Sequence, residues 1–339
     1  METLQIVWFV LVAVLLAGYA VLDGFDLGVG ALYPFLGKTA DEQRVLRHSI
    51  GPVWDANEVW LLTGGGALFA AFPPVYATVF SGFYLALMLV LFALIFRAVS
   101  LEFAGHDPAW APLWNVAFFA GSALPALLFG VAAGNIHRGV PLAAGEYAGT
   151  FFTLLNPYAL LCGAMSLALF VAHGAAWTTL KTEGALRERA AAVRSATAWV
   201  ALSLVLAATA ATAVAAPERF RAVLTAPLGW ALVALLALAF GWARLSMKDP
   251  ARDRHAFYGS ALVLASLVGI GAVGQFPMLL PALGAPEASL TAFNSSSSTL
   301  TLTVMLIVAA VGMPIVLVYK TIVYRAFAGR LSLGEGGPY

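Results

Sequence analysis

Cysteine and histidine are scarce in this sequence, which limits the metal and redox chemistry that the chain can support alone. Cys162 is the single cysteine among 339 residues and falls within an apolar run. One thiol excludes an internal disulfide, a Cys-rich zinc site and an iron–sulfur cluster held by this chain alone. His173 lies inside a long apolar stretch, and the other histidines lie in loops or at helix edges: His48, His106, His137 and His255. Because a membrane haem b takes two axial ligands from helices, we expect neither a haem held by this chain alone nor a metal site.

Charged residues are also few. They make up 10% of the chain against 61% hydrophobic residues, whereas an ordinary soluble domain is about 25% charged. The 18 basic and 17 acidic residues give a net charge of +1, which gives no indication of a nucleic-acid partner. A soluble fold of this length could not bury so much apolar surface. The composition therefore predicts an all-α integral membrane protein surrounded by lipid.

Nine apolar stretches are long enough to cross a bilayer, which takes about 20 residues. They cover residues 5–32, 52–73, 76–98, 113–134, 155–177, 196–215, 227–245, 257–279 and 300–324. Pro73-Pro74 separates the second from the third and lacks backbone donors, which predicts a tight turn between two spans. The longest connections, 135–154 and 178–195, are interpreted as loops too short for a soluble domain. Residues 1–339 are therefore expected to form a single polytopic membrane domain.

The basic residues are distributed unevenly between the two sides of these spans. Of the 18 Lys and Arg residues, 15 lie in the connections after the first, third, fifth and seventh spans and in the C-terminal tail. The other three are Arg138, Arg219 and Arg221. Basic residues accumulate on the cytoplasmic side, so we expect a periplasmic N-terminus and a cytoplasmic C-terminus. Merging the second and third spans would remove this asymmetry, which favours nine. The serine run 295–298 before the last span is interpreted as a helix N-cap rather than a flexible linker.

Two acids lie near the inner end of the first span. Asp23 and Asp26 are three residues apart, which places both carboxylates on one helix face. Gly24 and Gly28 form a small-xxx-small pair that lets another helix come close. One interpretation is that the acids sit at the membrane surface and only fix the depth of the helix. The other is proton handling, because two adjacent carboxylates resist being ionised together.

A second cluster opens the second span, in the segment Trp54-Asp55-Ala56-Asn57-Glu58-Val59-Trp60. Asp55 and Glu58 share a helix face, and Asn57 lies beside them. Each residue alone has a structural explanation, because first-turn acids complement the helix dipole and tryptophans populate interfacial belts. The density of polar residues, followed by Gly64-Gly65-Gly66, favours a polar pocket between closely packed helices.

Arg97 lies at the inner end of the third span. It is a candidate counter-ion for one of these acids, and the alternative is an ordinary anchor at the cytoplasmic surface. Proton uptake needs titratable groups spaced for water-bridged transfer from the cytoplasm. We therefore predict a proton pathway formed by Asp55, Glu58, Asp23, Asp26 and Arg97.

These motifs resemble subunit II of the cytochrome bd-type quinol oxidases of bacterial respiratory membranes. The resemblance spans nearly the whole chain and is strongest over residues 20–100. The matching segments are Leu22 to Gly30 (LDGFDLGVG), Trp54 to Trp60 with the GGGALFAAFP that follows, Phe96-Arg97, Leu155-Asn156-Pro157 and Ser297 to Leu302 (SSTLTL).

The resemblance implies nine helices, in two four-helix bundles plus a peripheral helix, in the bacterial cytoplasmic (inner) membrane. It implies a heterodimer with a subunit I that carries haem b and haem d, oxidises quinol and reduces O2 to water. This chain would supply scaffold and a proton route from the cytoplasm to those haems, with Asp55 as the matching aspartate and Asp23 and Asp26 close by. Three further residues are expected to line the surface that faces the partner and its haems: Trp54, Asn57 and Trp60. A structural quinone and small single-helix accessory subunits are candidate additions that no motif here demonstrates.

Two other functions stay open from the residues alone. Intramembrane acids suit a proton-coupled secondary transporter, although the first two spans are not interrupted at mid-membrane and no inverted repeat is evident. The second alternative is a purely structural membrane subunit whose acids only bond to its partner. Co-purification with a haem protein that absorbs visible light would support the oxidase, and a colourless homomer would support transport.

Overall fold

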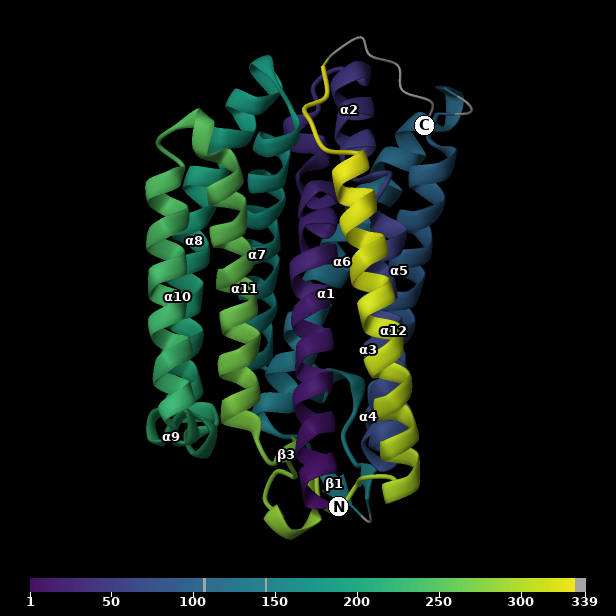
Figure 1. Ribbon diagram of the computed structural model, residues 1–339, viewed down its shortest axis with the longest axis vertical. Coiled ribbons are helices and arrows are strands. Elements are labelled where there is room, and N and C mark those ends of the chain that lie inside the picture. The colour runs from purple at the N-terminus through teal and green to yellow at the C-terminus, as the bar shows by residue number, and fades with distance from the viewer. Residues whose placement is uncertain (106–107, 144, 333–339) are drawn as a thin grey trace.

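The computed structural model describes residues 1–105, 108–143 and 145–332, so His106 lies outside the described residues. Its α-helices are α1 (Glu2–Leu36), α2 (Ala40–Ile50), α3 (Trp54–Ala71), α4 (Pro73–Gly82), α5 (Tyr84–Phe103), α6 (Ala111–Arg138), α7 (Pro157–Lys181), α8 (Gly184–Ala215), α9 (Pro217–Thr225), α10 (Pro227–Ser246), α11 (Asp253–Gln275) and α12 (Thr299–Ala326). Short 3-10 turns are η1 (Pro108–Trp110), η2 (Phe151–Leu155), η3 (Pro250–Arg252) and η4 (Pro286–Ala288). The long helices run side by side along the long axis, and α12 ends at the opposite end of the molecule from the start of α1 (Figure 1).

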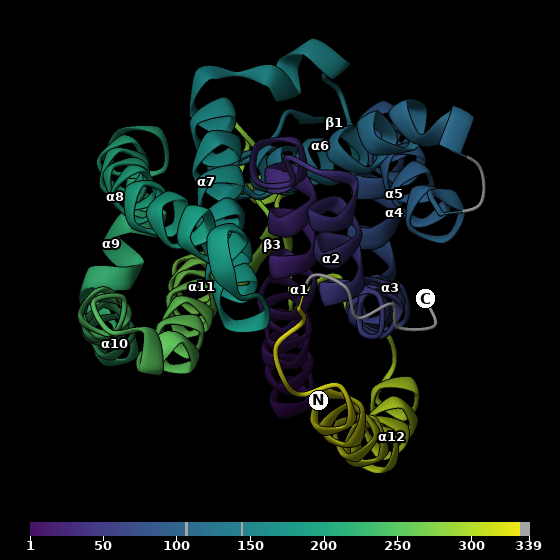
Figure 2. The ribbon, with the colours of Figure 1, turned by 90° about the horizontal axis from the view of Figure 1, so that it is seen from above.

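Helix α1 lies at the centre of the molecule. Seen from above, α7 to α11 lie on one side of it, α2 to α6 lie on the other, and α12 lies at the periphery (Figure 2). Close approach of α7 depends on glycine: a Cβ on Gly28 would lie 1.9 Å from the carbonyl oxygen of Phe170, and one on Gly174 would lie 2.4 Å from the carbonyl carbon of Gly28. The small-residue contact predicted at Gly28 is therefore present, and it holds the acid-bearing segment of α1 inside the bundle.

Within the described residues, eight helices are long and apolar enough to cross a membrane. They are α1, α5, α6, α7, α8, α10, α11 (with η3) and α12. Helix α3, which occupies the second predicted span, has 18 residues and is not one of the eight. The expectation of a multi-pass helical membrane protein is confirmed, and the ninth crossing stays a prediction.

The predicted span 76–98 is two helices rather than one. Helix α3 ends at Ala71 and α4 begins at Pro73, so the predicted turn at the proline pair is present. The helical path is interrupted a second time at Phe83, between the end of α4 and the start of α5. Ser81 and Gly82 precede this second break within an otherwise apolar stretch, so hydropathy does not reveal it, and the side chain of Tyr147 occupies the space beside Gly82.

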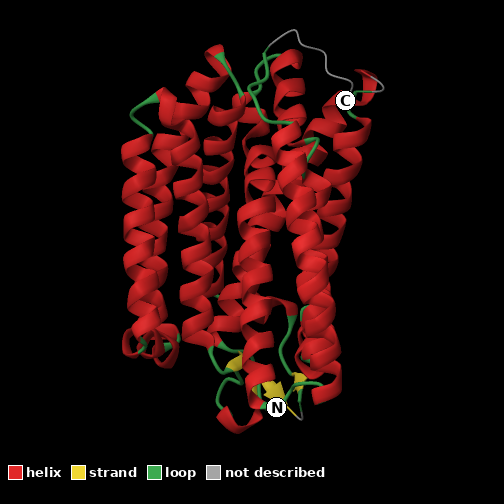
Figure 3. Ribbon diagram, in the orientation of Figure 1, coloured by secondary structure: helices red, strands yellow, loops and turns green. Residues whose placement is uncertain are grey.

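Other loop predictions also need correction. The region 178–195 is almost entirely helical, because α7 continues to Lys181 and α8 begins at Gly184. The all-α expectation misses two small antiparallel hairpins at the end of the molecule where α1 begins (Figure 3). Their strands are β1 (Leu142–Ala143) with β2 (Glu146–Tyr147) and β3 (Met278–Leu280) with β4 (Leu290–Thr291). Ser298 is the N-cap of α12 and accepts a hydrogen bond from the Thr301 amide, as predicted for the serine run.

Candidate functional site

Asp23 of α1 and Arg97 of α5 form an ion pair in the interior. Nη1 of Arg97 donates to Oδ2 of Asp23 at 3.2 Å, and Nη2 donates to Oδ1 at 2.6 Å, with both side chains fully buried. Gly121 of α6 makes room, since a Cβ there would lie 2.8 Å from the Arg97 amide nitrogen. Removing either partner would leave an uncompensated buried charge, which is strongly destabilising. Arg97 is thus an internal counter-ion rather than an anchor at the membrane surface.

Asp26 belongs to a second branch of the same cluster. Its Oδ2 accepts a hydrogen bond from Nδ2 of Asn57 on α3 at 2.8 Å. Oδ1 of that amide accepts from Nζ of Lys320 at 2.7 Å and from the hydroxyl of Tyr324 at 3.0 Å, both on α12. Oδ1 of Asp26 is buried and has no hydrogen-bond partner among the described residues. Asp26 is therefore linked to the Lys320 cation through an amide, whereas Asp23 pairs with Arg97 directly.

The two acids of α3 lie nearer to the end of the molecule that carries most basic residues. Oε2 of Glu58 is 3.7 Å from Nη2 of Arg97, and the Glu58 side chain is 21% exposed. Asp55, one turn closer to the start of α3, is exposed, and no ion pair of Asp55 occurs in the described ranges. The structure thus brings Asp23, Asp26, Glu58 and Arg97 together and leaves Asp55 at the rim.

The remaining predicted residues of α3 point to different surroundings. Asn57 is buried, and its amide also donates to the Leu22 carbonyl oxygen at 3.0 Å, so it belongs to the acid cluster rather than to an outer surface. Trp60 is buried against Gly18 of α1, and Nζ of Lys320 lies 5.8 Å from the centre of its ring. Trp54 is half-buried, with the Arg97 guanidinium 6.0 Å from its ring centre. Of these three side chains, only Trp54 is partly exposed, so a role facing a partner stays a prediction.

His173 of α7 does not offer a free ring nitrogen. Its Nε2 lies 3.0 Å from the Val21 carbonyl oxygen and its Nδ1 lies 2.7 Å from the Ser260 hydroxyl. A carbonyl oxygen only accepts, so Nε2 carries the proton and donates to it. The ring also stacks on Phe257 at 4.7 Å between centroids. These contacts make His173 part of the packing between α1, α7 and α11, and they do not fit an axial haem ligand.

Comparison with known proteins then identifies the family. A family model described as cytochrome bd terminal oxidase subunit II matches residues 4–327. The chain belongs to the cytochrome bd oxidase subunit II family. Among curated relatives, this bd subunit II is 42% identical to the probable cytochrome oxidase subunit 2 of Haemophilus influenzae, over 98% of this chain and 96% of that protein. It is 38% identical to the cytochrome bd-I ubiquinol oxidase subunit 2 of Escherichia coli K12, over the same shares, and 37% identical to the cytochrome bd ubiquinol oxidase subunit 2 of Bacillus subtilis, over 100% of both.

The fold of this bd subunit II matches a solved structure as well. The structure of bd oxidase from Geobacillus thermodenitrificans aligns with a TM-score of 0.80 at 16% identity, over 96% of this chain and 98% of that one. Family membership and the eight apolar helices make the chain a multi-pass protein of the bacterial inner membrane and a subunit of a quinol oxidase complex. Family membership also implies a subunit I partner. Among the functions that the sequence left open, it favours the oxidase over the transporter.

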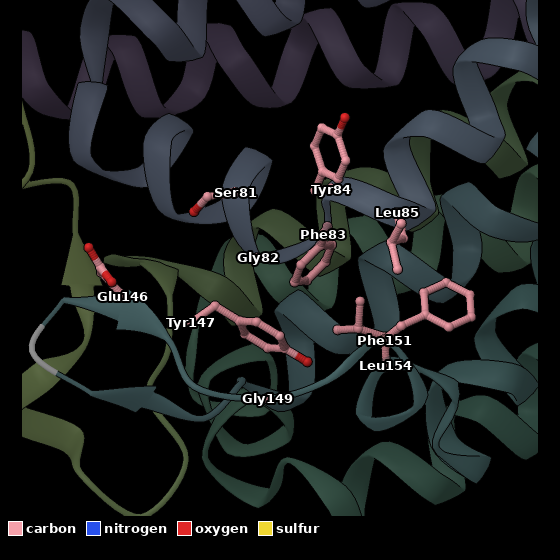
Figure 4. A pocket seen from close by; sticks show the side chains of 10 residues that line it. All are labelled: Ser81, Gly82, Phe83, Tyr84, Leu85, Glu146, Tyr147, Gly149, Phe151 and Leu154. Carbon is pink, nitrogen blue, oxygen red and sulfur yellow. The ribbon is translucent and has the colours of Figure 1, made fainter.

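A hollow in this bd subunit II lies away from the acid cluster. It measures about 370 Å³ and lies between the junction of α4 with α5 and the β1–β2 hairpin, near the end where α1 begins. Figure 4 shows the rings of Phe83, Tyr84, Tyr147 and Phe151 around it. None of the sequence-predicted site residues lines it, so it is separate from the acid cluster.

Sequence reasoning missed two members of the cluster in this bd subunit II. Lys320 and Tyr324 lie in α12, and Lys320 is only 7% exposed. Lys320 is grouped above with the basic residues of the cytoplasmic tail, although its position within the span 300–324 is itself a signal. An ionisable residue inside a span needs a partner, and here that partner is Asn57.

Proposed function

We propose that this chain supplies the scaffold and a cytoplasmic proton-uptake path for a bd-type quinol:oxygen oxidoreductase. In this proposal the haems b and d are bound by subunit I, quinol is the electron donor, and O2 is reduced to water there. The chain alone is not expected to be active. Family membership supports the assembly, and the acid cluster supports the proton path.

The observation that carries the proposal is the graded exposure of four acids between α1 and α3. Asp55 is exposed, Glu58 is 21% exposed, and Asp23 and Asp26 are fully buried. Titratable groups that lead from water into a buried cluster are what proton uptake requires, and ionisable residues inside spans mark proton relays in many membrane proteins. Asp23 is bound to Arg97 through both oxygens, so Asp26, with one unpartnered oxygen, is the better candidate to accept a proton.

The proposed topology has nine crossings with a periplasmic N-terminus. Helix α3 is the ninth crossing, since it joins α2 at one end of the molecule to α4 at the other (Figure 1). One four-helix bundle then holds α1, α3, α5 and α6, the other holds α7, α8, α10 and α11, and α12 is the peripheral helix. The distribution of Lys and Arg supports the orientation.

Substitution of single acids in the two-subunit complex tests the proton path. We expect Asp26→Asn to lower quinol-driven O2 consumption about 100-fold, the lower end of what a proton-transfer group contributes, with normal haem content. Asp55→Asn should lower it about tenfold, because water can partly replace an exposed carboxylate. The matched control is Asp41→Asn in α2, an acid at the same end of the molecule whose side chain is 68% exposed.

Oxygen consumption by an oxygen electrode and haem content by absorption distinguish the outcomes. Unchanged turnover in both Asp26→Asn and Asp55→Asn would remove the acids from the mechanism and leave a structural subunit. Equal losses of turnover and haem would mean that the substitutions act on assembly.

A further inference from the structure

Helix α12 contributes one buried cation to the acid cluster. Most of this helix is exposed on the molecule, yet Lys320 is 7% exposed and directs Nζ toward α3, 2.7 Å from Oδ1 of Asn57. Tyr324, one turn further along, donates to the same oxygen at 3.0 Å. Two donors from a peripheral helix thus converge on one amide between α1 and α12.

These two donors fix the orientation of the Asn57 amide. An ammonium group has no acceptor, so the side-chain oxygen must face Lys320. The NH2 group then faces α1, where it reaches Oδ2 of Asp26 at 2.8 Å and the Leu22 carbonyl oxygen at 3.0 Å. Asn57 therefore connects Lys320 to Asp26 through two short hydrogen bonds, one accepted by its oxygen and one donated by its NH2 group.

The charge balance of the cluster depends on Lys320. Asp23, Asp26 and Glu58 supply three carboxyl groups, and Arg97 and Lys320 supply two cations. With every group ionised the cluster carries one negative charge, so binding of one proton makes it neutral, which is favourable in a low-dielectric interior. Oδ1 of Asp26, which has no hydrogen-bond partner in the part of the chain that the structure describes, is the atom that such a proton would use.

The other charged and titratable groups nearby come from the packed helices. They are Tyr19 and Asp23 on α1, Glu58 on α3, Arg97 on α5, Tyr324 on α12, and His173 on α7, which bonds to the Val21 carbonyl oxygen. Arg97 is engaged by Asp23 through both guanidinium NH2 groups. Lys320 is then the cation whose loss changes the field at Asp26 without dismantling the Asp23 pair.

We infer that Lys320 is a positioning residue of the proton path: through Asn57 it controls when Asp26 holds and releases a proton. The inference rests on the proposed proton-uptake function. Its chemistry is a reversible proton transfer at the Asp26 carboxyl group, with water as the proton donor on the cytoplasmic side. Lys320 keeps its own proton and acts by charge.

The test uses the two-subunit complex with four substitutions in this chain. Lys320→Gln removes the charge and keeps an N–H donor for Asn57, whereas Lys320→Arg keeps the charge. Arg325→Gln is the matched control, because Arg325 is an exposed cation on the same helix. Oxygen consumption is measured as a function of pH, with haem content as the measure of assembly. Lys320→Met is the second charge-free variant, and it keeps the test open where Lys320→Gln reduces the yield of complex.

We expect Lys320→Gln to move the acid limb of the pH profile about one unit to higher pH, the order expected from a unit charge that is two hydrogen bonds away. Loss of the positive charge favours the protonated Asp26, so a higher pH is needed to free the carboxylate. Lys320→Arg and Arg325→Gln should keep the wild-type profile.

Two outcomes separate this inference from the proposed function. If Asp26→Asn slows turnover while both charge-free Lys320 variants keep the wild-type profile, the role of Lys320 is wrong and the proton path stands. If Asp26→Asn itself turns over normally, the proton path through Asp26 fails, and the role of Lys320 fails with it. A profile that shifts equally in Lys320→Gln and Lys320→Arg would also overturn the inference, since the charge would not be the cause.

Discussion

Asp253, the first residue of α11, shows how one acid organises one end of the molecule. It is 1% exposed and meets three guanidinium groups. Arg187 donates to it at 2.6 and 3.0 Å, Arg194 at 2.8 Å, and Arg330 at 3.4 Å. Through these contacts Asp253 joins α8, α11 and the segment that follows α12.

Loss of the Asp253 charge should destabilise the folded chain. Asp253→Asn leaves Arg194, which is 2% exposed, without a carboxylate, and breaking a buried pair costs about 3–5 kcal/mol. The midpoint of thermal unfolding in detergent, followed by circular dichroism, should fall by several degrees. Asp249→Asn is the control, because its partner Arg252 is 63% exposed and an exposed pair contributes about 0–1 kcal/mol. Equal midpoints for the two variants would contradict a stabilising role for the buried cluster.

At the scale of elements, the packing of α1 on α7 determines where the acid cluster lies. The two backbones touch at Gly28 and Gly174, and Phe170 packs over Gly24. A helix held this closely presents its opposite side, with Asp23 and Asp26, to α3 and α5. The geometry of the cluster therefore depends on small residues that take no part in its chemistry.

Adding a methyl group at this contact should weaken the fold. In Gly28→Ala the new Cβ would lie 1.9 Å from the Phe170 carbonyl oxygen, which is backbone and cannot rotate away. Overpacking of this kind costs about 1–3 kcal/mol, so the thermal midpoint should fall. Gly241→Ala in α10 has open space around its Cβ and should keep or raise the midpoint. A Gly28→Ala variant as stable as wild type would mean that α1 and α7 separate at little cost.

An ion pair outside the spans links α2 to α8 and should make stability depend on pH. Nη2 of Arg189 lies 2.5 Å from Oε1 of Glu42, and this hydrogen bond, with that from the Lys38 amide, lowers the pKa of Glu42. A carboxyl group with a lowered pKa in the folded chain stabilises it above the unfolded pKa of about 4.3 and loses that contribution as pH falls through the folded value.

The corresponding measurement compares Glu42→Gln with wild type at pH 7 and at acid pH. The difference in thermal midpoint should be largest at pH 7 and should shrink as the pH falls below about 4. Glu188→Gln, an exposed acid on α8, should give a small difference that does not change with pH. A gap between Glu42→Gln and wild type that stays constant down to acid pH would show that the pair is not responsible.

The sequence predicts some of these elements well and others poorly, for physical reasons. A helix is expected over 52–73 and α3 runs from Trp54 to Ala71, because the proline pair 73–74 is a local signal for where this helix ends. Several residues in the region 178–195 are charged, so the sequence predicts a loop there. In the structure α8 begins at Gly184 and continues through this region. The Lys320 contact joins residues 263 positions apart, and no local pattern reports such a pairing.

At the scale of the whole molecule, α1 joins two groups of helices while α12 stands apart. Helix α1 contacts α3 and α6 on one side and α7 and α11 on the other. Only Leu302 and Lys320 of α12 are buried within this chain, so lipid or a partner subunit must cover the rest of the helix. The polar anchor from Lys320 to Asn57 then lies between the peripheral helix and the centre of the molecule.

The orientation of the molecule in the membrane can be measured directly through α11. The two ends of this helix lie on opposite sides of the membrane. Ala251 in η3 lies just before the start of α11, and Glu287 in η4 lies beyond its end. If most basic residues face the cytoplasm, Glu287→Cys reacts with a membrane-impermeant maleimide in cells with a permeable outer envelope and an intact inner membrane. Ala251→Cys reacts only after the inner membrane is opened.

Replacement of the buried Cys162 by Ala provides the background, because no other cysteine then remains. Labelling of Ala251→Cys in intact membranes would invert the topology and place the exposed Asp55 on the periplasmic side, where it could not take up protons from the cytoplasm.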